Sequence, residues 1–327
     1  DESPPAAGRI LVEPVWPQKG RLMQDQADRR LQPRALAPPD QTQSRAATRL
    51  AERRRFAAAL GLGLAGFLST GLPVWAGGWT DQRANRTFFC RANFSLRDYE
   101  PLLIELSHLQ ADVKQSLNVA PPREPIELYL FKDKRTYQDY LKLRFPEAPD
   151  RRALFIKGAG PGQVFVYRSD ELVVDVRHES THALLHATLA MVPLWLDEGI
   201  AEYFEVPPDE RAYRKKYVAS LRWYLRFGKA PRLTTLEAKR DVEEMSANDY
   251  RDAWSWVHFM LHGPPAARQE LLGFLGDIQA GAAPGRLSDR LAQRVPHLEA
   301  QWVEHFRALK PTPDLAAQPS QSAPRVR

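Results

Sequence analysis

His178-Glu179-Ser180-Thr181-His182 is followed, with fifteen residues intervening, by Glu198-Gly199-Ile200-Ala201-Glu202. Two histidines four residues apart project from one face of a helix, and the glutamate after the first leans toward whatever they hold. Neutral imidazoles are ligands that zinc prefers in proteins. The spacing therefore predicts a helix that carries two ligands of one Zn²⁺ ion, His178 and His182.

The third ligand is predicted from the segment after this helix. A catalytic zinc site has three protein ligands at about 2 Å and leaves the fourth position to water. Apolar residues around Glu198 recur at helical spacing, so a second helix can direct this carboxylate at the histidines. Glu202 lies four residues later on the same face and is an alternative third ligand, although we favour an orienting role for it. Asp197 points about 100° away from Glu198 and is predicted to bond a helix terminus or a histidine.

Two further polar residues on the first helix receive weaker predictions. His186 follows His182 by four residues, but side chains on three successive turns of a straight helix lie at different heights along its axis. We therefore assign His186 to packing or to orienting a ligand. Asp175, three residues before His178, is either another orienting acid or a solvated helix position.

The glutamate inside the motif suggests a chemical role. A zinc ion lowers the pKa of its water to about 7, and an adjacent carboxylate can then take the proton. Glu179 is placed for this task, which would end with proton transfer to the leaving amine of a cleaved peptide bond. The sequence thus predicts a zinc-dependent hydrolase, most simply a metallopeptidase acting on a peptide or protein substrate.

The motif and its continuation Pro-x-Trp-Leu-Asp-Glu-Gly-x-Ala-Glu-Tyr resemble the gluzincin metallopeptidases, and within them a peptidase-MA-like bacterial family of unknown function. The resemblance spans about Arg86 to Phe274. It implies that Glu198 is the third zinc ligand. It also implies that Tyr250, in a Tyr-x-x-Ala-Trp run, supports the tetrahedral intermediate as a catalytic residue, although a tyrosine at the start of an amphipathic helix can serve packing alone.

This sequence departs from the aminopeptidase-like gluzincins in two respects. The interval between His182 and Glu198 is fifteen residues rather than eighteen, and the Gly-x-Met-Glu-Asn segment that grips a substrate's amino terminus is missing. Exopeptidase specificity is therefore not implied. Two alternatives stay open: a non-catalytic zinc-containing envelope protein that binds a partner, and hydrolysis of a different bond by the same zinc-activated water.

The regions outside the motif define the predicted domains. Residues 1–48 are rich in Pro, Gln and Arg and are predicted to be disordered, as is the tail at 311–327. Residues 49–76 combine an arginine run with an apolar run at 56–72, which predicts a signal peptide or a membrane anchor. We therefore expect an exported protein, periplasmic or secreted, or alternatively one anchored to the inner membrane by an uncleaved segment.

A single α+β domain is predicted at 80–310. Its first part, 80–168, is predicted to form a small mixed sheet with helices, from strands at Thr87–Phe94, 126–131 and 163–167 and helices at 98–117 and 134–143. The glycines at 158, 160 and 162 predict a hairpin connection. The second part, 169–310, is predicted to be mainly helical and to carry the motif helix, with helices at about 170–190, 195–205, 209–227, 247–262, 265–280 and 298–309.

Charge and cysteine content exclude other classes. The formal charge is +6, but residues 1–55 already hold 11 Arg and Lys against 7 Asp and Glu, and no basic face with interleaved aromatics stands out. We therefore predict no nucleic-acid partner. Cys90 is the single cysteine, which excludes an intramolecular disulfide and a paired-cysteine metal site; its apolar neighbours predict a buried thiol.

Overall fold

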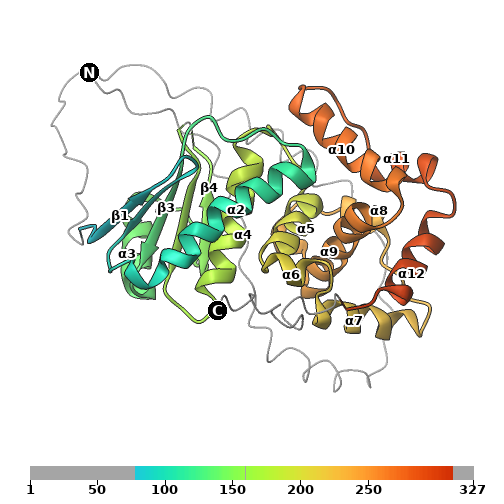
Figure 1. The fold of residues 1–327 in the computed structure, drawn as a ribbon, viewed down its shortest axis with the longest axis horizontal. Helices are drawn as coiled ribbons and strands as arrows, with labels where there is room; N and C mark the ends of the chain where they lie inside the picture. Colours follow the sequence, from blue (N-terminus) through green and yellow to red (C-terminus); the bar gives the residue numbers. More distant parts are fainter. Residues whose placement is uncertain (1–77, 159, 312–327) are drawn as a thin grey trace, which may run out of the picture. The chain divides into compact units, whose positions relative to one another are not determined.

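The computed structural model describes residues 78–158 and 160–311 (Figure 1). The segments predicted as disordered or as a signal or anchor, 1–48 and 49–76, lie outside the described residues, as do residues 312–327 of the predicted tail. Within the described part of the chain, no helix is both long enough and apolar enough to cross a bilayer.

The first half of the domain is built on a five-stranded mixed sheet with the strand order β1-β2-β3-β5-β4. The three central strands run parallel, whereas β1 and β4 pair antiparallel at the two edges. Two predicted strands, β3 and β5, have the predicted bounds, and the hairpin predicted from the glycines joins β4 to β5. The strands are β1 (Asp81–Ala84), β2 (Phe88–Ala92), β3 (Ile126–Phe131), β4 (Ala153–Ile156) and β5 (Gln163–Tyr167).

Helices cover both faces of this sheet. The helices α2 (Glu100–Leu117) and α4 (Leu172–His186) lie on one face, and α3 (Lys134–Arg144) lies on the other (Figure 1). Alternation along β3 supplies both interfaces, because Leu128 belongs to the core beneath α2 and α4 whereas Tyr129 belongs to the aromatic core beneath α3. The sheet thus holds α4, the helix that carries the histidine motif, against a buried apolar surface.

The second half is helical, which confirms the predicted α+β fold with a mainly helical second part. The predicted helix at 209–227 is two helices, because Arg214 has an extended backbone, with φ −80° and ψ 91°, that separates them. Two short helices, α8 and α11, were not predicted. The elements are α5 (Leu194–Phe204), α6 (Pro208–Arg211), α7 (Lys215–Leu225), α8 (Leu233–Glu237), α9 (Ala247–His262), α10 (Pro265–Gln279), α11 (Leu287–Arg294) and α12 (Leu298–Ala308).

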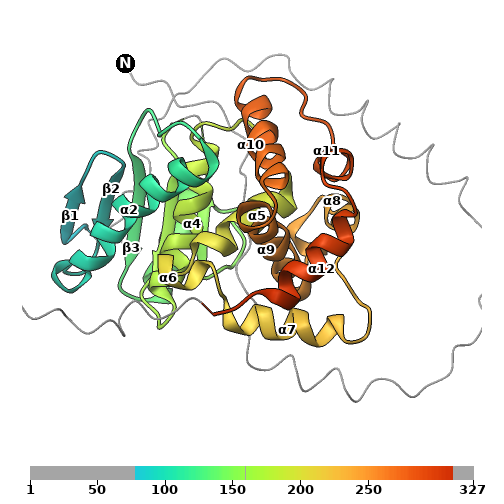
Figure 2. The same ribbon diagram turned by 45° about the vertical axis from the view of Figure 1, so that its right-hand side comes forward.

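A close contact between α5 and α9 fixes the position of the second motif helix. Both views show the two helices side by side (Figures 1 and 2). A Cβ atom added to Gly199 would lie 2.7 Å from the carbonyl oxygen of Ala253 and 2.9 Å from Cγ2 of Val257. Only glycine therefore permits this approach, and the residue beside it, Glu198, is held at a defined place.

Candidate metal centre

The two helices α4 and α5 bring the predicted ligands together. His178, Glu179 and His182 lie on α4, and Glu198 lies on α5, which packs against α4. The ligand atoms of the two histidines and Glu198 lie within 4.8 Å of one another. The sequence prediction that one carboxylate from the second helix meets the two histidines agrees with this placement.

Distances within this group suit a shared cation. Oε2 of Glu198 lies 3.5 Å from Nε2 of His178 and 3.9 Å from Nε2 of His182. Both separations exceed the usual length of a hydrogen bond. Ligands that each lie about 2 Å from a tetrahedral zinc ion are themselves separated by roughly 3.4 Å. The three atoms thus surround a point that a metal ion can occupy.

Burial makes this arrangement costly without a cation. Glu198 is 0% exposed, and neither of its carboxylate oxygens makes a hydrogen bond in the described part of the chain. Nε2 of His178 is likewise buried without a hydrogen-bond partner there. Buried polar atoms are normally satisfied, and a buried carboxylate most of all. The buried group formed by His178, His182 and Glu198 can therefore hold a metal ion.

A second acidic layer lies behind His178. Nδ1 of His178 is 2.9 Å from Oε2 of Glu205, so this ring donates its Nδ1 hydrogen to a carboxylate and turns Nε2 toward Glu198. Glu205 and Glu202 both pair with the guanidinium of Arg214, and the Tyr217 hydroxyl donates to Glu202 at 2.6 Å. His178, Glu202 and Glu205 also form a buried group whose ligand atoms lie within 4.8 Å of one another. Glu202, the alternative ligand predicted from the sequence, thus lies in a second candidate metal group, which Arg214 partly neutralises.

Asp197 supports the other histidine. Its carboxylate lies 3.1 Å from Nδ1 of His182 and 2.7 Å from Nε2 of His186. Burial raises the pKa of Asp197, but the contacts to His186 and His182 outweigh it and hold that pKa well below the usual range. His186 therefore lies behind the carboxylate that contacts His182, stacked against Phe155 at a centroid distance of 5.7 Å.

The acidic side chains of the site stabilise a positive charge on His178, which lies between them. Beside them, Glu179 is a proton acceptor. Burial lowers the pKa of His178, but Glu198 and Glu205 more than compensate and raise it well above the usual value. Glu179 is 1% exposed, and burial raises its pKa to about 7 against the opposing effect of the two histidines. A carboxyl group with that pKa can accept and release a proton near neutral pH.

The remaining predicted residues take different places. Tyr250 lies half-buried in the first turn of α9, three residues before Ala253, the residue that approaches Gly199. Asp175 is buried, so the solvated alternative is wrong, and it pairs with Arg152 at 2.6 Å.

Three supporting residues were missed in the sequence: Glu205, Arg214 and Tyr217. The spacing of Glu198, Glu202 and Glu205, at positions i, i+4 and i+7 of one helix, is the signal that could have revealed Glu205.

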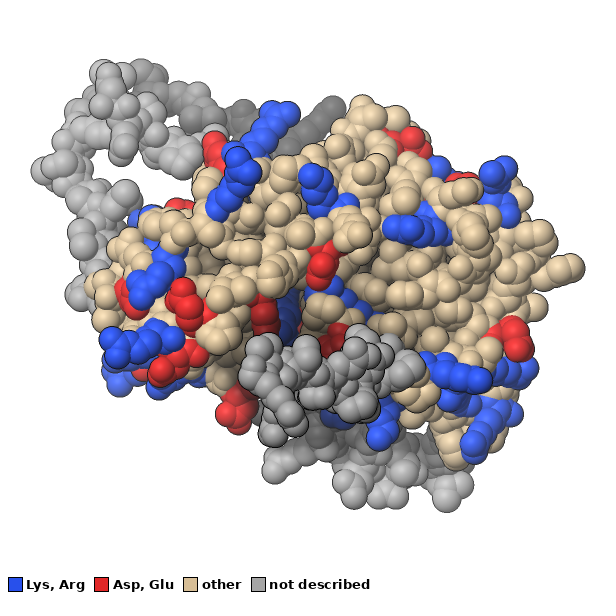
Figure 3. All heavy atoms as spheres, viewed as in Figure 1, with Lys and Arg blue, Asp and Glu red and all other residues tan. Residues whose placement is uncertain are grey.

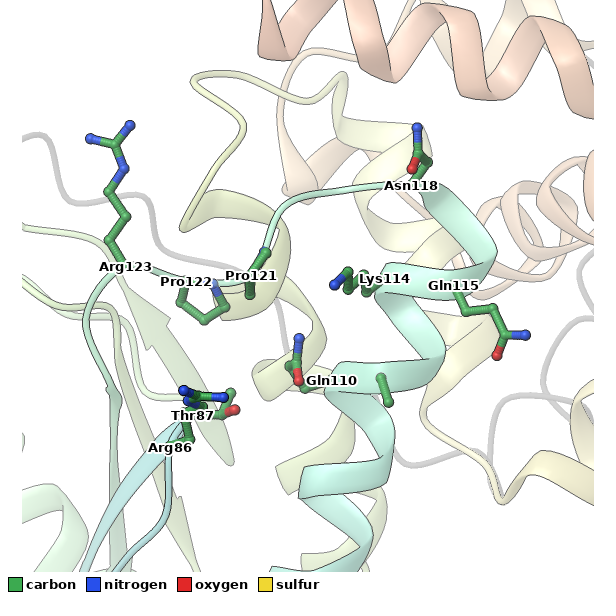
Figure 4. Close-up of a pocket in the computed structure, with 10 residues that line it drawn as sticks. Arg86, Thr87, Gln110, Lys114, Gln115, Asn118, Pro121, Pro122 and Arg123 are labelled. Carbon is green, nitrogen blue, oxygen red and sulfur yellow. The ribbon is translucent and has the colours of Figure 1, made fainter.

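A separate cavity of about 690 Å³ lies between the end of α2, the following loop and the start of β2 (Figure 4). Lys114 extends from α2 toward Pro121, whereas Arg123 points away from the helix. The lining contains no acidic side chain, no histidine and none of the residues of the metal centre. This cavity therefore offers no group with the chemistry expected of Glu179.

Comparison of the chain with protein-family models finds no match, and comparison with curated proteins finds none either.

Proposed function

We propose that this chain is a zinc-dependent peptidase of the gluzincin type. The observation that supports it best is the convergence of His178, His182 and Glu198 on one buried point beside Glu179. Two imidazoles and one carboxylate form a donor set that suits zinc, whereas magnesium and calcium prefer oxygen ligands throughout. Three protein ligands also leave one position open, which is the arrangement typical of catalytic zinc.

The residues around the centre have separate roles in peptide hydrolysis. Bound zinc would supply a Lewis acid that polarises a carbonyl group and lowers the pKa of a water molecule to about 7. Glu179 takes the proton of the attacking water on its carboxylate and passes it to the leaving amine. Asp197 and Glu205 hold the rings of His182 and His178 in the orientation that ligation requires.

Tyr250 completes the proposed machinery. Its hydroxyl would donate a hydrogen bond to the oxygen of the tetrahedral intermediate, a role that rests on the resemblance to gluzincins. The tight packing of α9 against α5 supports this, because it ties the helix of Tyr250 to the helix of Glu198.

The burial of the centre favours one alternative. His178 is 3% exposed and Glu179 is 1% exposed, so a substrate reaches them only when the residues that cover them move. Closed sites are typical of structural zinc. The alternative is therefore a non-catalytic zinc-containing envelope protein, in which the ion joins α4 to α5 and a surface of the protein binds a partner.

Metal analysis and hydrolysis of a mixed peptide library separate these functions. We expect about one zinc ion per chain, cleavage by the native protein, and for Glu179→Gln full zinc content with turnover reduced about 10²- to 10⁴-fold. Glu210→Gln, on the exposed surface of α6, is the matched control and should change neither property. Stoichiometric zinc without cleavage at any pH would reject the peptidase, and a panel of ester and amide substrates would then test hydrolysis of other bonds.

A further inference from the structure

The segment from Arg211 to Leu236, which contains α7, has an unusual composition. It holds eight Arg and Lys residues and no Asp or Glu. Three of the eight are used internally: Arg211 pairs with Asp112, Arg214 with Glu202 and Glu205, and Arg222 donates to backbone carbonyls at the end of α12. Internal pairing thus accounts for fewer than half of these charges.

The other five basic residues face solvent. They are exposed, and none forms an ion pair with an acidic side chain among residues 78–158 and 160–311; they are Lys215, Lys216, Arg226, Lys229 and Arg232. Lys and Arg side chains gather at the lower right of the space-filling view, over α7 (Figure 3). Over the sheet half in the same view, basic and acidic side chains are interspersed. The α7 region therefore carries an uncompensated positive charge.

Two aromatic rings stand out from the same surface. Trp223 is 57% exposed and Phe227 is 61% exposed, and their ring centroids lie 5.3 Å apart. The guanidinium of Arg226 lies 6.0 Å from the centre of the Trp223 ring. The other large exposed apolar residues of the described chain are single ones on separate elements, namely Ile104, Leu143, Val173 and Met191. Isolated exposed apolar residues are common on protein surfaces, whereas two adjacent exposed aromatic rings are not.

The internal packing of α7 explains why these rings cannot turn inward. Tyr217, Val218, Leu221 and Leu225 already fill the buried face of the helix. Arg222 fixes the helix further, since its Nε donates to the carbonyl of Phe306 at 2.9 Å. Lys215 and Trp223 lie on the opposite side of the helix, and Phe227 follows in the turn after its C-terminal end. The surface of α7 and the turn after it is thus a platform that presents aromatic rings flanked by cations.

From this platform we propose that α7 docks on the surface of an anionic lipid bilayer. Tryptophan and phenylalanine insert at the level of the headgroups, while flexible Lys and Arg side chains reach the lipid phosphates and carboxylates. Each basic residue near such a surface contributes about fivefold in affinity. A nucleic acid matches the charge, but the two rings lie at 70° to each other and so do not form one flat surface on which successive bases stack. An acidic protein partner needs no lipid; both are outcomes of the test below.

A fluorescent label on the platform tests this proposal in the full chain. Phe227→Cys introduces a thiol for an environment-sensitive dye, because the native Cys90 is 1% exposed. On addition of vesicles that contain phosphatidylserine, the emission should shift to shorter wavelength and brominated lipids should quench it. Vesicles of phosphatidylcholine alone should have little effect. Met191→Cys, labelled in the same way at a residue that is 74% exposed on another segment, is the control and should not respond.

Charge reversal supplies the second arm. Lys215→Glu combined with Lys216→Glu should weaken the vesicle response at least about tenfold, whereas Lys142→Glu on the exposed surface of α3 should leave it unchanged. A label at position 227 that stays in water with anionic vesicles overturns the proposal, even if the chain binds the vesicles elsewhere. A response to an oligonucleotide or to an acidic protein, without a response to vesicles, overturns it in favour of that partner.

Discussion

Nδ1 of His178 lies 2.9 Å from Oε2 of Glu205, a residue seven positions beyond Glu198 on the same side of α5. One face of a single helix thus provides both the carboxylate opposite Nε2 of His178 and the carboxylate that holds the other nitrogen of the same ring. Arg214 closes this arrangement, because it pairs with Glu205 and with Glu202. The candidate ligand and the carboxylate that supports its histidine thus come from one helix and its C-cap, which fixes their relative positions.

Replacement of Glu205 by glutamine should weaken metal binding. The amide keeps the shape of the side chain but is a poorer acceptor for the His178 ring, and loss of such support costs about 10- to 100-fold in metal affinity. Competition with a chelating dye would measure this. Glu237→Gln, a residue that pairs with Arg286 far along the chain, is the control for loss of a carboxylate. Equal affinity of Glu205→Gln and the native chain would show that Glu205 does not orient the ligand.

Glu198 and Glu202 should differ when each is replaced by glutamine. Glu198 has no hydrogen bond in the described chain and faces both Nε2 atoms, so Glu198→Gln should lower zinc affinity by more than 100-fold. Glu202→Gln instead leaves Arg214 with one carboxylate fewer in a buried place, which should reduce stability by about 1–3 kcal/mol.

Zinc content after dialysis and unfolding in urea would separate these two effects. The reverse pattern, with zinc lost from Glu202→Gln and kept by Glu198→Gln, would assign the third ligand to Glu202.

The sequence predicted what depends on local pattern and missed what depends on tertiary contact. The sequence identified the correct elements from the apolar runs of β3 and β5 and from the helical spacing around His178 and Glu198. The period at which apolar residues recur shows whether one face or two faces of an element are buried. The strand β1 has the polar sequence Asp-Gln-Arg-Ala, and only its pairing with β2 makes it a strand.

The supporting residues of the metal centre show the same division. Glu205 reads as one more acid on a helix until the fold turns the ring of His178 toward it. Arg214 interrupts a sequence that otherwise reads as one helix from 209 to 227, and the break lets its guanidinium reach Glu202 and Glu205. Spacing along the chain places Glu205 on the same helix face as Glu198, but it reveals neither contact, since both contacts join elements that pack only in the folded domain.

Gly199 should be intolerant of even a methyl group. In Gly199→Ala the new Cβ would lie 2.7 Å from a backbone oxygen of α9, so the two helices must separate, at a cost of about 1–3 kcal/mol. Because Glu198 precedes this residue, the shift should also reduce zinc affinity. Gly276→Ala is the matched control: its Cβ meets nothing within 4 Å on an exposed helix, and it should stabilise the protein by about 0.5–1 kcal/mol. Urea unfolding of both variants tests the contrast, which would fail if Gly199→Ala were as stable as the native chain.

A cluster of histidines in the helical half should make stability depend on pH. The carbonyl of Ala212 can only accept, so Nε2 of His258 carries the hydrogen in their 2.9 Å contact and Nδ1 accepts from His305 at 3.0 Å. Burial, with a further contribution from His262, lowers the pKa of His258 to about 3. The ring is therefore held neutral inside the fold.

The pH dependence follows from the direction of this shift. A histidine in the unfolded chain has a pKa near 6.5. Between about pH 6.5 and pH 3, His258 is therefore protonated in the unfolded chain but stays neutral in the native protein. The stabilisation is complete above pH 6.5 and is lost as the pH falls, by about 3 kcal/mol at pH 4. His258→Asn should flatten this part of the pH profile, whereas His297→Asn, at an exposed residue with positive φ that asparagine tolerates, should retain it. Urea midpoints at pH 7 and pH 4 measure the difference, and parallel profiles for His258→Asn and the native chain would refute a neutral buried ring.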